Sequence, residues 1–159
     1  MSQDTIAAIA TPPGVGGIGI IRLSGQNSLS IAESLTQSSL KAGSTQFRKF
    51  FDAQKQQLDH GIVLYFKSPH SFTGEDVIEL QGHGGVILQE MMLSRVCELG
   101  ARIAHAGEYS ERAFHNDKLD LTQAEAIADL IESGSQAAAR AAMRSLQGVF
   151  SEKIHSLVE

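Results

Sequence analysis

The chain contains 159 residues, a length that suits one domain of ordinary size or one domain with part of another. Because 42% of the residues are hydrophobic and only 19% are charged, the sequence can form a buried core. The formal net charge of −5 argues against this segment as the main binding surface for nucleic acid, because phosphate binding relies on clustered Lys and Arg. Cys97 is the only cysteine, which excludes an internal disulfide and predicts a reducing, cytoplasmic environment.

We expect no targeting signal at the N-terminus. Residues 1–10, MSQDTIAAIA, have no basic region ahead of their apolar residues, and no apolar run approaches the length of a membrane span. We therefore predict neither a signal peptide nor a transmembrane segment. Cys97 lies within a helical pattern, which favours a buried, unreactive thiol over a nucleophile.

A glycine-rich segment, TPPGVGGIG at residues 11–19, contains G-x-G-x-x-G at Gly14, Gly16 and Gly19. This pattern binds dinucleotides where it follows a strand and opens a helix. Here the apolar runs at residues 5–10 and 18–23 are both typical of strands. We therefore expect a strand-loop-strand in which glycine permits a sharp turn or a close backbone approach, with no nucleotide site.

The patterns up to residue 116 predict strands and helices in mixed order. Helices are predicted at residues 26–36, 86–99 and 107–116, and further strands at residues 47–53, 61–66, 76–80 and 101–106. QGHGG at residues 81–85 precedes the second of these helices, and it suits a tight turn, which is favoured, or an anion site. Together the elements predict an α+β fold with a mixed sheet of about six strands and flanking helices.

From Thr122 onward the sequence is helical. Thr122 and Glu125 match a capping box, and apolar residues keep helical spacing over residues 127–157. Gly134 or Gly148 is expected to divide this segment into two helices. Because the pattern reaches residue 159 without a stop signal, we expect the chain to be the front part of a longer protein.

Three charged residues are candidates for ligand binding. Strand alternation places Arg22 among apolar residues of its strand, and Glu79 interrupts another half-buried strand. A structural ion pair between Arg22 and Glu79 and a role in ligand binding are both open at this point. Lys118 precedes the predicted capping box, at a type of position where most lysines are solvated.

Other kinds of site find no support in the sequence. The histidines at positions 60, 70, 83, 105, 115 and 155 form neither H-E-x-x-H nor an i, i+4 pair, so no metal site is predicted. The absence of Gly-Lys excludes a Walker A motif, and there is no G-x-S-x-G. We therefore predict no catalytic residue in this chain.

Three long motifs occur in the order DTIAAIATPPGVGGIGIIRLSG, SFTGEDVIELQGHGG and AGEYSERAFHNDKLDLTQAEAIADLIES. In this order and spacing they closely resemble the N-terminal domain of the MnmE (TrmE) family of tRNA-modifying GTPases. The resemblance implies a folate-binding domain over residues 1–120, like that of aminomethyltransferases, followed at residues 121–159 by the opening helices of a helical domain. Arg22, Glu79 and Lys118 match the family's folate-contacting positions, which favours a ligand-binding role for Lys118 as well.

The resemblance also implies cofactors and partners. The ligand would be 5-formyl- or 5,10-methylene-tetrahydrofolate, bound between two N-terminal domains of a homodimer. GTP, Mg²⁺ and K⁺ would bind only in a GTPase domain that this chain lacks. Full-length members act with the flavoprotein MnmG on the wobble uridine of certain tRNAs, where they install an aminomethyl or carboxymethylaminomethyl group at C5. This chain by itself is expected neither to hydrolyse GTP nor to complete that modification.

Two functions stay open. The first is a folate-binding module, and the second is a dimerisation scaffold whose folate site is incomplete without absent C-terminal helices. Arg22 and Glu79 on half-buried strands favour the first, whereas an apolar stripe of Leu146, Phe150 and Ile154 favours the second. Val15 stands where family members often carry arginine, so no charge contact is expected from that loop.

Overall fold

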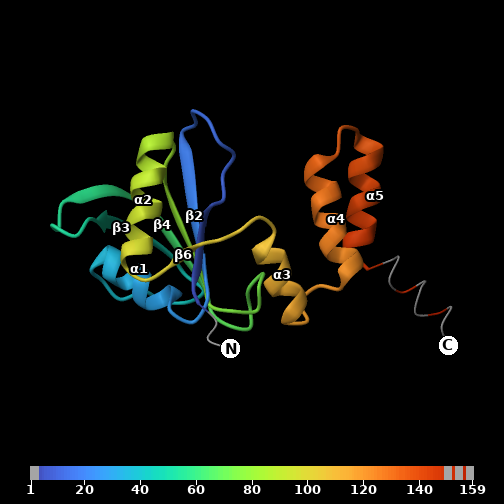
Figure 1. The fold of residues 1–159 in the computed structure, drawn as a ribbon, viewed down its shortest axis with the longest axis horizontal. Coiled ribbons are helices and arrows are strands. Elements are labelled where there is room, and N and C mark those ends of the chain that lie inside the picture. Colours follow the sequence, from blue (N-terminus) through green and yellow to red (C-terminus); the bar gives the residue numbers. More distant parts are fainter. Residues whose placement is uncertain (1–3, 149–151, 153–155, 157–159) are drawn as a thin grey trace. The chain divides into compact units, whose positions relative to one another are not determined.

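The computed structural model describes residues 4–148, 152 and 156, which divide into two compact units, Met1–Ala106 and Gly107–Glu159. Figure 1 shows the elements of both units. In chain order the first unit contains β1 (Ile6–Ile9), β2 (Ile18–Ser24), α1 (Ser28–Thr36), β3 (Thr45–Phe51), β4 (Gln57–Phe66), β5 (Val77–His83), α2 (Val86–Glu98) and β6 (Arg102–Ile103). The second contains α3 (Glu108–His115), α4 (Leu121–Glu132) and α5 (Gln136–Leu146).

The strands of the first unit form one sheet in the order β3-β4-β5-β2-β1-β6. Neighbouring strands are antiparallel throughout, except that β1 and β6 run parallel. The predicted α+β class with a mixed sheet of six strands is therefore confirmed.

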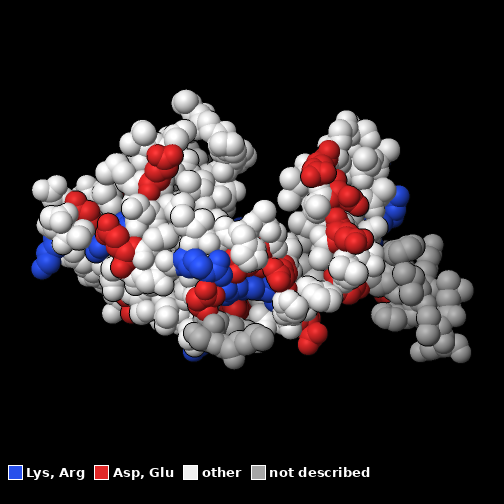
Figure 2. Space-filling view, in the orientation of Figure 1, with Lys and Arg blue, Asp and Glu red and all other residues white. Residues whose placement is uncertain are grey.

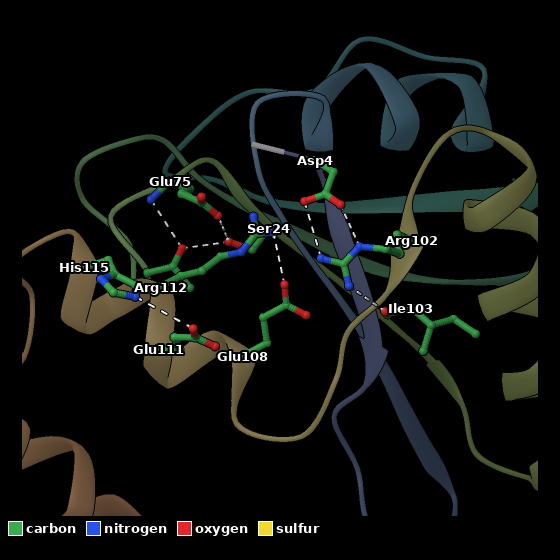
Figure 3. Close-up of polar contacts among 10 residues, drawn as sticks. Asp4, Ser24, Glu75, Arg102, Ile103, Glu108, Glu111, Arg112 and His115 are labelled. Carbon is green, nitrogen blue, oxygen red and sulfur yellow. Dashed lines mark hydrogen bonds and ion pairs between the residues drawn. The ribbon is translucent and has the colours of Figure 1, made fainter. Parts of the chain in front are cut away.

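β6 is shorter than the strand predicted at residues 101–106, because only Arg102 and Ile103 pair with β1. Arg102 holds this edge strand in place through both its backbone and its side chain. Its backbone N donates to Thr5 O at 2.8 Å, and its Nε donates to Asp4 Oδ2 at 2.6 Å (Figure 3). The short edge offers little unpaired backbone to another strand.

One face of the sheet is buried beneath α1 and α2 (Figure 1). Strand alternation directs every second side chain to this face, and the two helices contribute the matching apolar residues. The cluster includes Ile21, Leu23, Val63, Ile78 and Leu80 from the strands and Ile31, Ala32, Leu35, Met92 and Val96 from the helices. Each large buried aliphatic side chain contributes roughly 1.5–3 kcal/mol, so the core fixes the register of the strands and thereby which residues occupy the opposite face.

Two strands are longer than the sequence patterns predict. β4 begins at Gln57 instead of residue 61, and β5 continues to His83 instead of ending at residue 80. Residues 81–83 pair with residues 20–18 of β2, so the predicted turn at residues 81–85 is wrong for its first three positions. Gly82 suggested a turn, but in the structure it lies in the strand and leaves room for a carboxylate, that of Asp59.

The second unit consists of helices, and α4 and α5 pack against each other. They separate at residues 133–135, which confirms Gly134 as the dividing point. The capping box predicted at Thr122 and Glu125 is wrong. Asp120 is the N-cap of α4, since its Oδ1 accepts from Gln123 N at 2.8 Å while Gln123 Oε1 accepts from Asp120 N at 3.0 Å.

The correction has a physical reason. An aspartate N-cap satisfies an unpaired amide and also places negative charge at the positive end of the helix dipole, which a threonine two residues later cannot do. The predicted apolar stripe beyond Gly148, which includes Phe150, Ile154 and Leu157, lies outside the described residues.

Candidate functional site

Arg22 and Glu79 meet on the exposed face of the sheet. They are direct cross-strand partners of β2 and β5, and Arg22 Nη2 lies 2.8 Å from Glu79 Oε1. Arg22 Nε donates to the same oxygen at 3.1 Å. The side chains are 34% and 15% exposed, respectively. The ion pair that the sequence left open is therefore formed, and it leaves Glu79 within reach of a ligand.

The carboxylate of Glu79 keeps acceptor capacity beyond this ion pair. Its other oxygen, Oε2, accepts one hydrogen bond from Gln81 Nε2 at 3.3 Å. A carboxylate has about four lone-pair sites, and the three hydrogen bonds described use three of them. Apolar neighbours flank the group, because Ile20 and Leu64 occupy adjacent positions on the same face. The arrangement suits a ligand that donates an N–H group.

The glycine-rich segment supports close packing of backbone on backbone. Gly84 N donates to Gly17 O at 3.2 Å, and a Cβ at Gly84 would collide with Gly16 O. Gly14 has a φ of +129°, which other residues rarely adopt. The segment runs from β1 into β2, so the predicted strand-loop-strand is confirmed, and no helix follows these glycines as a dinucleotide site requires.

The N-terminus of α2 shows a structural role for the glycines at residues 84 and 85. Gly84 N–H already donates to the neighbouring loop, and Gly85 O accepts from Gln89 N at 3.1 Å. Gln89 is also fixed by Thr11, whose Oγ1 donates to Gln89 Oε1 at 2.9 Å. Since the first of these amides is engaged, the structure favours the tight turn over the anion site.

A cavity of about 270 Å³ lies between this loop and α2. Its lining comprises Ile9, Thr11, Pro13, Gly14, Val86, Gln89 and Glu90. The candidate residues Arg22 and Glu79 are not among them, so the cavity is separate from the ion pair.

Lys118 belongs to the second unit and is described with that unit alone. It is exposed and follows α3, where its backbone N donates to Ala113 O at 2.8 Å. It lines a pocket of about 520 Å³ together with Phe114, His115, Asp117, Leu119, Asp120 and Gln123. The structure thus brings Arg22 and Glu79 together and places Lys118 at a hollow in the other unit.

Acidic side chains follow α4 in the second unit (Figure 2). Glu125, Asp129 and Glu132 are exposed and lie at spacings of four and three residues, on one side of the helix. This stripe would repel phosphate groups, which agrees with the net charge of −5.

Sequence reasoning missed one polar arrangement, formed by Asp59 and His83. Asp59 Oδ1 lies 2.7 Å from His83 Nδ1, and Asp59 Oδ2 accepts from His83 N at 2.8 Å. Burial acts to raise the pKa of Asp59, but the hydrogen bonds from His83 outweigh it and lower that pKa below its usual value of 3.8. The sequence analysis gave no signal for it, because the predicted strand began at residue 61; only the observed start of β4 at Gln57 puts Asp59 at a core position of a strand, where a carboxylate needs a partner.

Cys97 is half-buried where the sequence predicted a buried thiol, and this partial burial raises the pKa of the thiol, which agrees with an unreactive cysteine. Among the residues that the structure describes, no cluster of His, Cys, Asp or Glu is suited to a metal ion, and no helix is long and apolar enough to cross a membrane.

Comparison with known proteins gives the family. Residues 5–118 match the family described as GTP-binding protein TrmE N-terminus. The tRNA modification GTPase MnmE of Acinetobacter baumannii (strain ATCC 17978) is 63% identical over 159 residues, and the protein of the same name from Psychrobacter sp. (strain PRwf-1) is 63% identical over 156. That from Chromohalobacter salexigens is 59% identical over 157 residues. These matches cover 98–99% of the chain but only 34–35% of each relative. The chain therefore belongs to the TrmE N-terminal family.

Proposed function

We propose that residues 1–120 bind a one-carbon tetrahydrofolate and form a homodimer. The observation that carries the folate proposal is the carboxylate of Glu79, which pairs with Arg22, lies on the sheet face opposite α1 and α2 and has acceptor capacity left. A pterin ring presents amino and ring N–H groups along one edge, and these are the donors that such a carboxylate accepts. The ligand would be 5-formyl- or 5,10-methylene-tetrahydrofolate, held by a domain like that of aminomethyltransferases.

Arg22 and Lys118 would supply the complementary donors. Arg22 orients Glu79 and carries N–H groups suited to a carbonyl oxygen, and the ammonium group of Lys118 is suited to carboxylates. Lys118 lines a hollow at the end of α3, which agrees with a role in contacting a ligand.

The whole protein would act in tRNA modification. The relatives are named tRNA modification GTPases, and the chain spans about 35% of the length of the first of them. We propose that the full-length protein works in the cytoplasm with MnmG on the wobble uridine of tRNA, where a C5 aminomethyl or carboxymethylaminomethyl group is installed. GTP, Mg²⁺ and K⁺ would bind in a GTPase domain outside this chain, with residues 121–159 opening a helical domain.

A dimerisation scaffold with an incomplete folate site is the second candidate. It is favoured by large apolar side chains that α4 and α5 leave exposed, since Ile131 is 79% and Met143 is 40% exposed. Such residues pack against other helices in bundles. If those helices also complete the ligand site, this chain would dimerise without binding folate.

Calorimetric titration of 5-formyl-tetrahydrofolate into the purified chain tests the proposal. Glu79→Gln should raise Kd at least about tenfold, because it replaces a charge-assisted acceptor by a neutral amide. Glu90→Gln is the matched control, since Glu90 is exposed on α2, which covers the other face of the sheet. Equal Kd values for wild type and Glu79→Gln would contradict the pterin assignment.

Sedimentation velocity on the same samples separates the two candidates. A wild-type dimer that binds 5-formyl-tetrahydrofolate supports the folate-binding module. A dimer of the wild-type chain that gives no heat with 5-formyl-tetrahydrofolate supports the scaffold.

A further inference from the structure

Asp59 holds the imidazole of His83 in one orientation on the exposed face of the sheet. The Asp59 side chain is only 6% exposed, whereas that of His83 is 60% exposed. Two hydrogen bonds join them, one from the backbone and one through Nδ1. A Cβ at Gly82 would collide with Asp59 Oδ2, so glycine at that position makes room for the carboxylate. The ring is therefore positioned by a buried group, as in sites where a carboxylate orients a functional histidine.

The protonation of the pair follows from Asp59. Hydrogen bonds from His83 keep the pKa of Asp59 low against the effect of burial, so the carboxylate is ionised and only accepts. Nδ1 of His83 must then carry the proton. In the neutral imidazole, Nε2 of His83 is left as a hydrogen-bond acceptor.

His60 on β4 lies beside His83 and has the opposite tautomer. The two rings are 5.3 Å apart at their centroids and stand edge to face at 82°. The amide Nε2 of Gln57 lies 3.3 Å from His60 Nδ1 and donates to it, which places the ring proton of His60 on Nε2. His60 thus presents a donor next to the acceptor of His83. In the described part of the chain, neither Nε2 has a hydrogen-bond partner.

An aromatic surface continues from this pair across the sheet. Phe47 on β3 is 64% exposed, and its ring centroid lies 5.3 Å from that of His60. Phe47, His60 and His83 therefore form a row of three rings, which we call the ring row, across β3, β4 and β5. Exposed rings with fixed polar edges suit a flat ligand that stacks and also makes directed hydrogen bonds.

The ring row lies on the same face as Glu79. Residues 79, 81 and 83 alternate along β5 toward that face, so Glu79 and His83 are separated by about 13 Å along the strand. An extended folate can bridge this distance, with its pterin at one end and its benzamide at the other.

We propose that the ring row is a second ligand-contacting site, which takes an aromatic amide by stacking and by paired hydrogen bonds to His60 and His83. The amide C=O accepts from His60 Nε2–H, and the anilino N–H at the opposite end of the same ring donates to His83 Nε2, because the C=O and N–H of a secondary amide point in opposite directions. The assignment of this amide to the aminobenzoyl part of a tetrahydrofolate rests on the proposed function. The recognition of the amide itself rests only on the ring row.

The probe is p-aminobenzoyl-glutamate, which lacks the pterin. Titration into the chain, followed by the NMR signals of the imidazole Hε1 protons, should shift the His60 and His83 resonances and leave those of His70 and His115 in place. His83→Asn and Phe47→Leu should each raise Kd about fivefold or more, since each removes one of the two kinds of contact. Phe47→Leu leaves Asp59 and His83 untouched, so it remains informative if His83→Asn disturbs the fold.

Two controls make the outcome decisive. Glu79→Gln should leave binding of p-aminobenzoyl-glutamate unchanged while weakening 5-formyl-tetrahydrofolate, which separates the ring row from the pterin proposal. Glutamate without the ring should cause no shift. If p-aminobenzoyl-glutamate shifts neither histidine, or if His83→Asn and Phe47→Leu bind it as the wild type does, the ring row is not a ligand site, whatever the result with the folate.

Discussion

Arg22 and Glu79 are joined through a single carboxylate oxygen, because both Nε and Nη2 of Arg22 donate to Oε1 of Glu79, at 3.1 Å and 2.8 Å. Their backbones are paired directly in the sheet, so the register of β2 and β5 alone brings the side chains together. The other oxygen of Glu79 is left to Gln81 and to the exposed face. Because Arg22 uses only one of the two carboxylate oxygens, Glu79 can form the ion pair and still accept a hydrogen bond from a ligand.

The ion pair should contribute modestly to stability. In a double-mutant cycle of Arg22→Ala and Glu79→Ala, we expect a coupling energy of about 1 kcal/mol, which falls as salt is added because both groups are partly exposed. Urea unfolding followed by circular dichroism measures it. Strictly additive effects at low salt would show that the contact does not contribute to folding.

Gly84→Ala tests the role of the glycine-rich segment. Its Cβ would meet the backbone oxygen of Gly16, which cannot move without displacing the loop, so we expect a loss of about 2 kcal/mol in the free energy of unfolding. Gly17→Ala is the control, because a Cβ there meets nothing within 4 Å and should change stability little. Equal effects of the two substitutions would contradict the close approach of the backbones.

Asp120→Ala should destabilise α4 by about 1 kcal/mol, because it removes the side chain that caps Gln123 N. Thr122→Ala should change stability by less than about 0.5 kcal/mol, since Thr122 is not the cap. Hydrogen exchange of the amides in the first turn of α4 reports both values. A larger loss of stability from Thr122→Ala than from Asp120→Ala would contradict Asp120 as the N-cap and would support the capping box predicted at Thr122.

Asp59 should make stability depend on acid pH. Its pKa lies below 3.8 in the folded protein, so the unfolded state binds the proton more tightly. The stabilisation by Asp59 is therefore complete at pH values above the pKa of Asp59 in the unfolded chain. It is lost as the pH falls through the pKa of Asp59 in the folded protein. The difference in free energy of unfolding between wild type and Asp59→Asn should shrink as the pH falls below about 4. A difference that stays constant down to pH 2 would show that the folded pKa of Asp59 is not lowered.

The local elements were predictable because their signals are local. Apolar runs predicted the strands around the glycine-rich segment, and the 3.6-residue period predicted α1 and α2 close to their observed bounds. Strand ends were less predictable. β5 extends to His83 because β2 supplies partners for it, and that pairing depends on residues about 60 positions earlier in the chain.

The sequence by itself determined the class of fold, the absence of an internal disulfide and the charged residues worth attention, because composition, spacing and long motifs carry those facts directly. Only the tertiary structure decided that Arg22 and Glu79 are partners, that Asp59 orients His83, and that His60 and Phe47 line up beside it. Strands distant in sequence must pair before such side chains share a face, and the buried core beneath α1 and α2 selects the register in which they do.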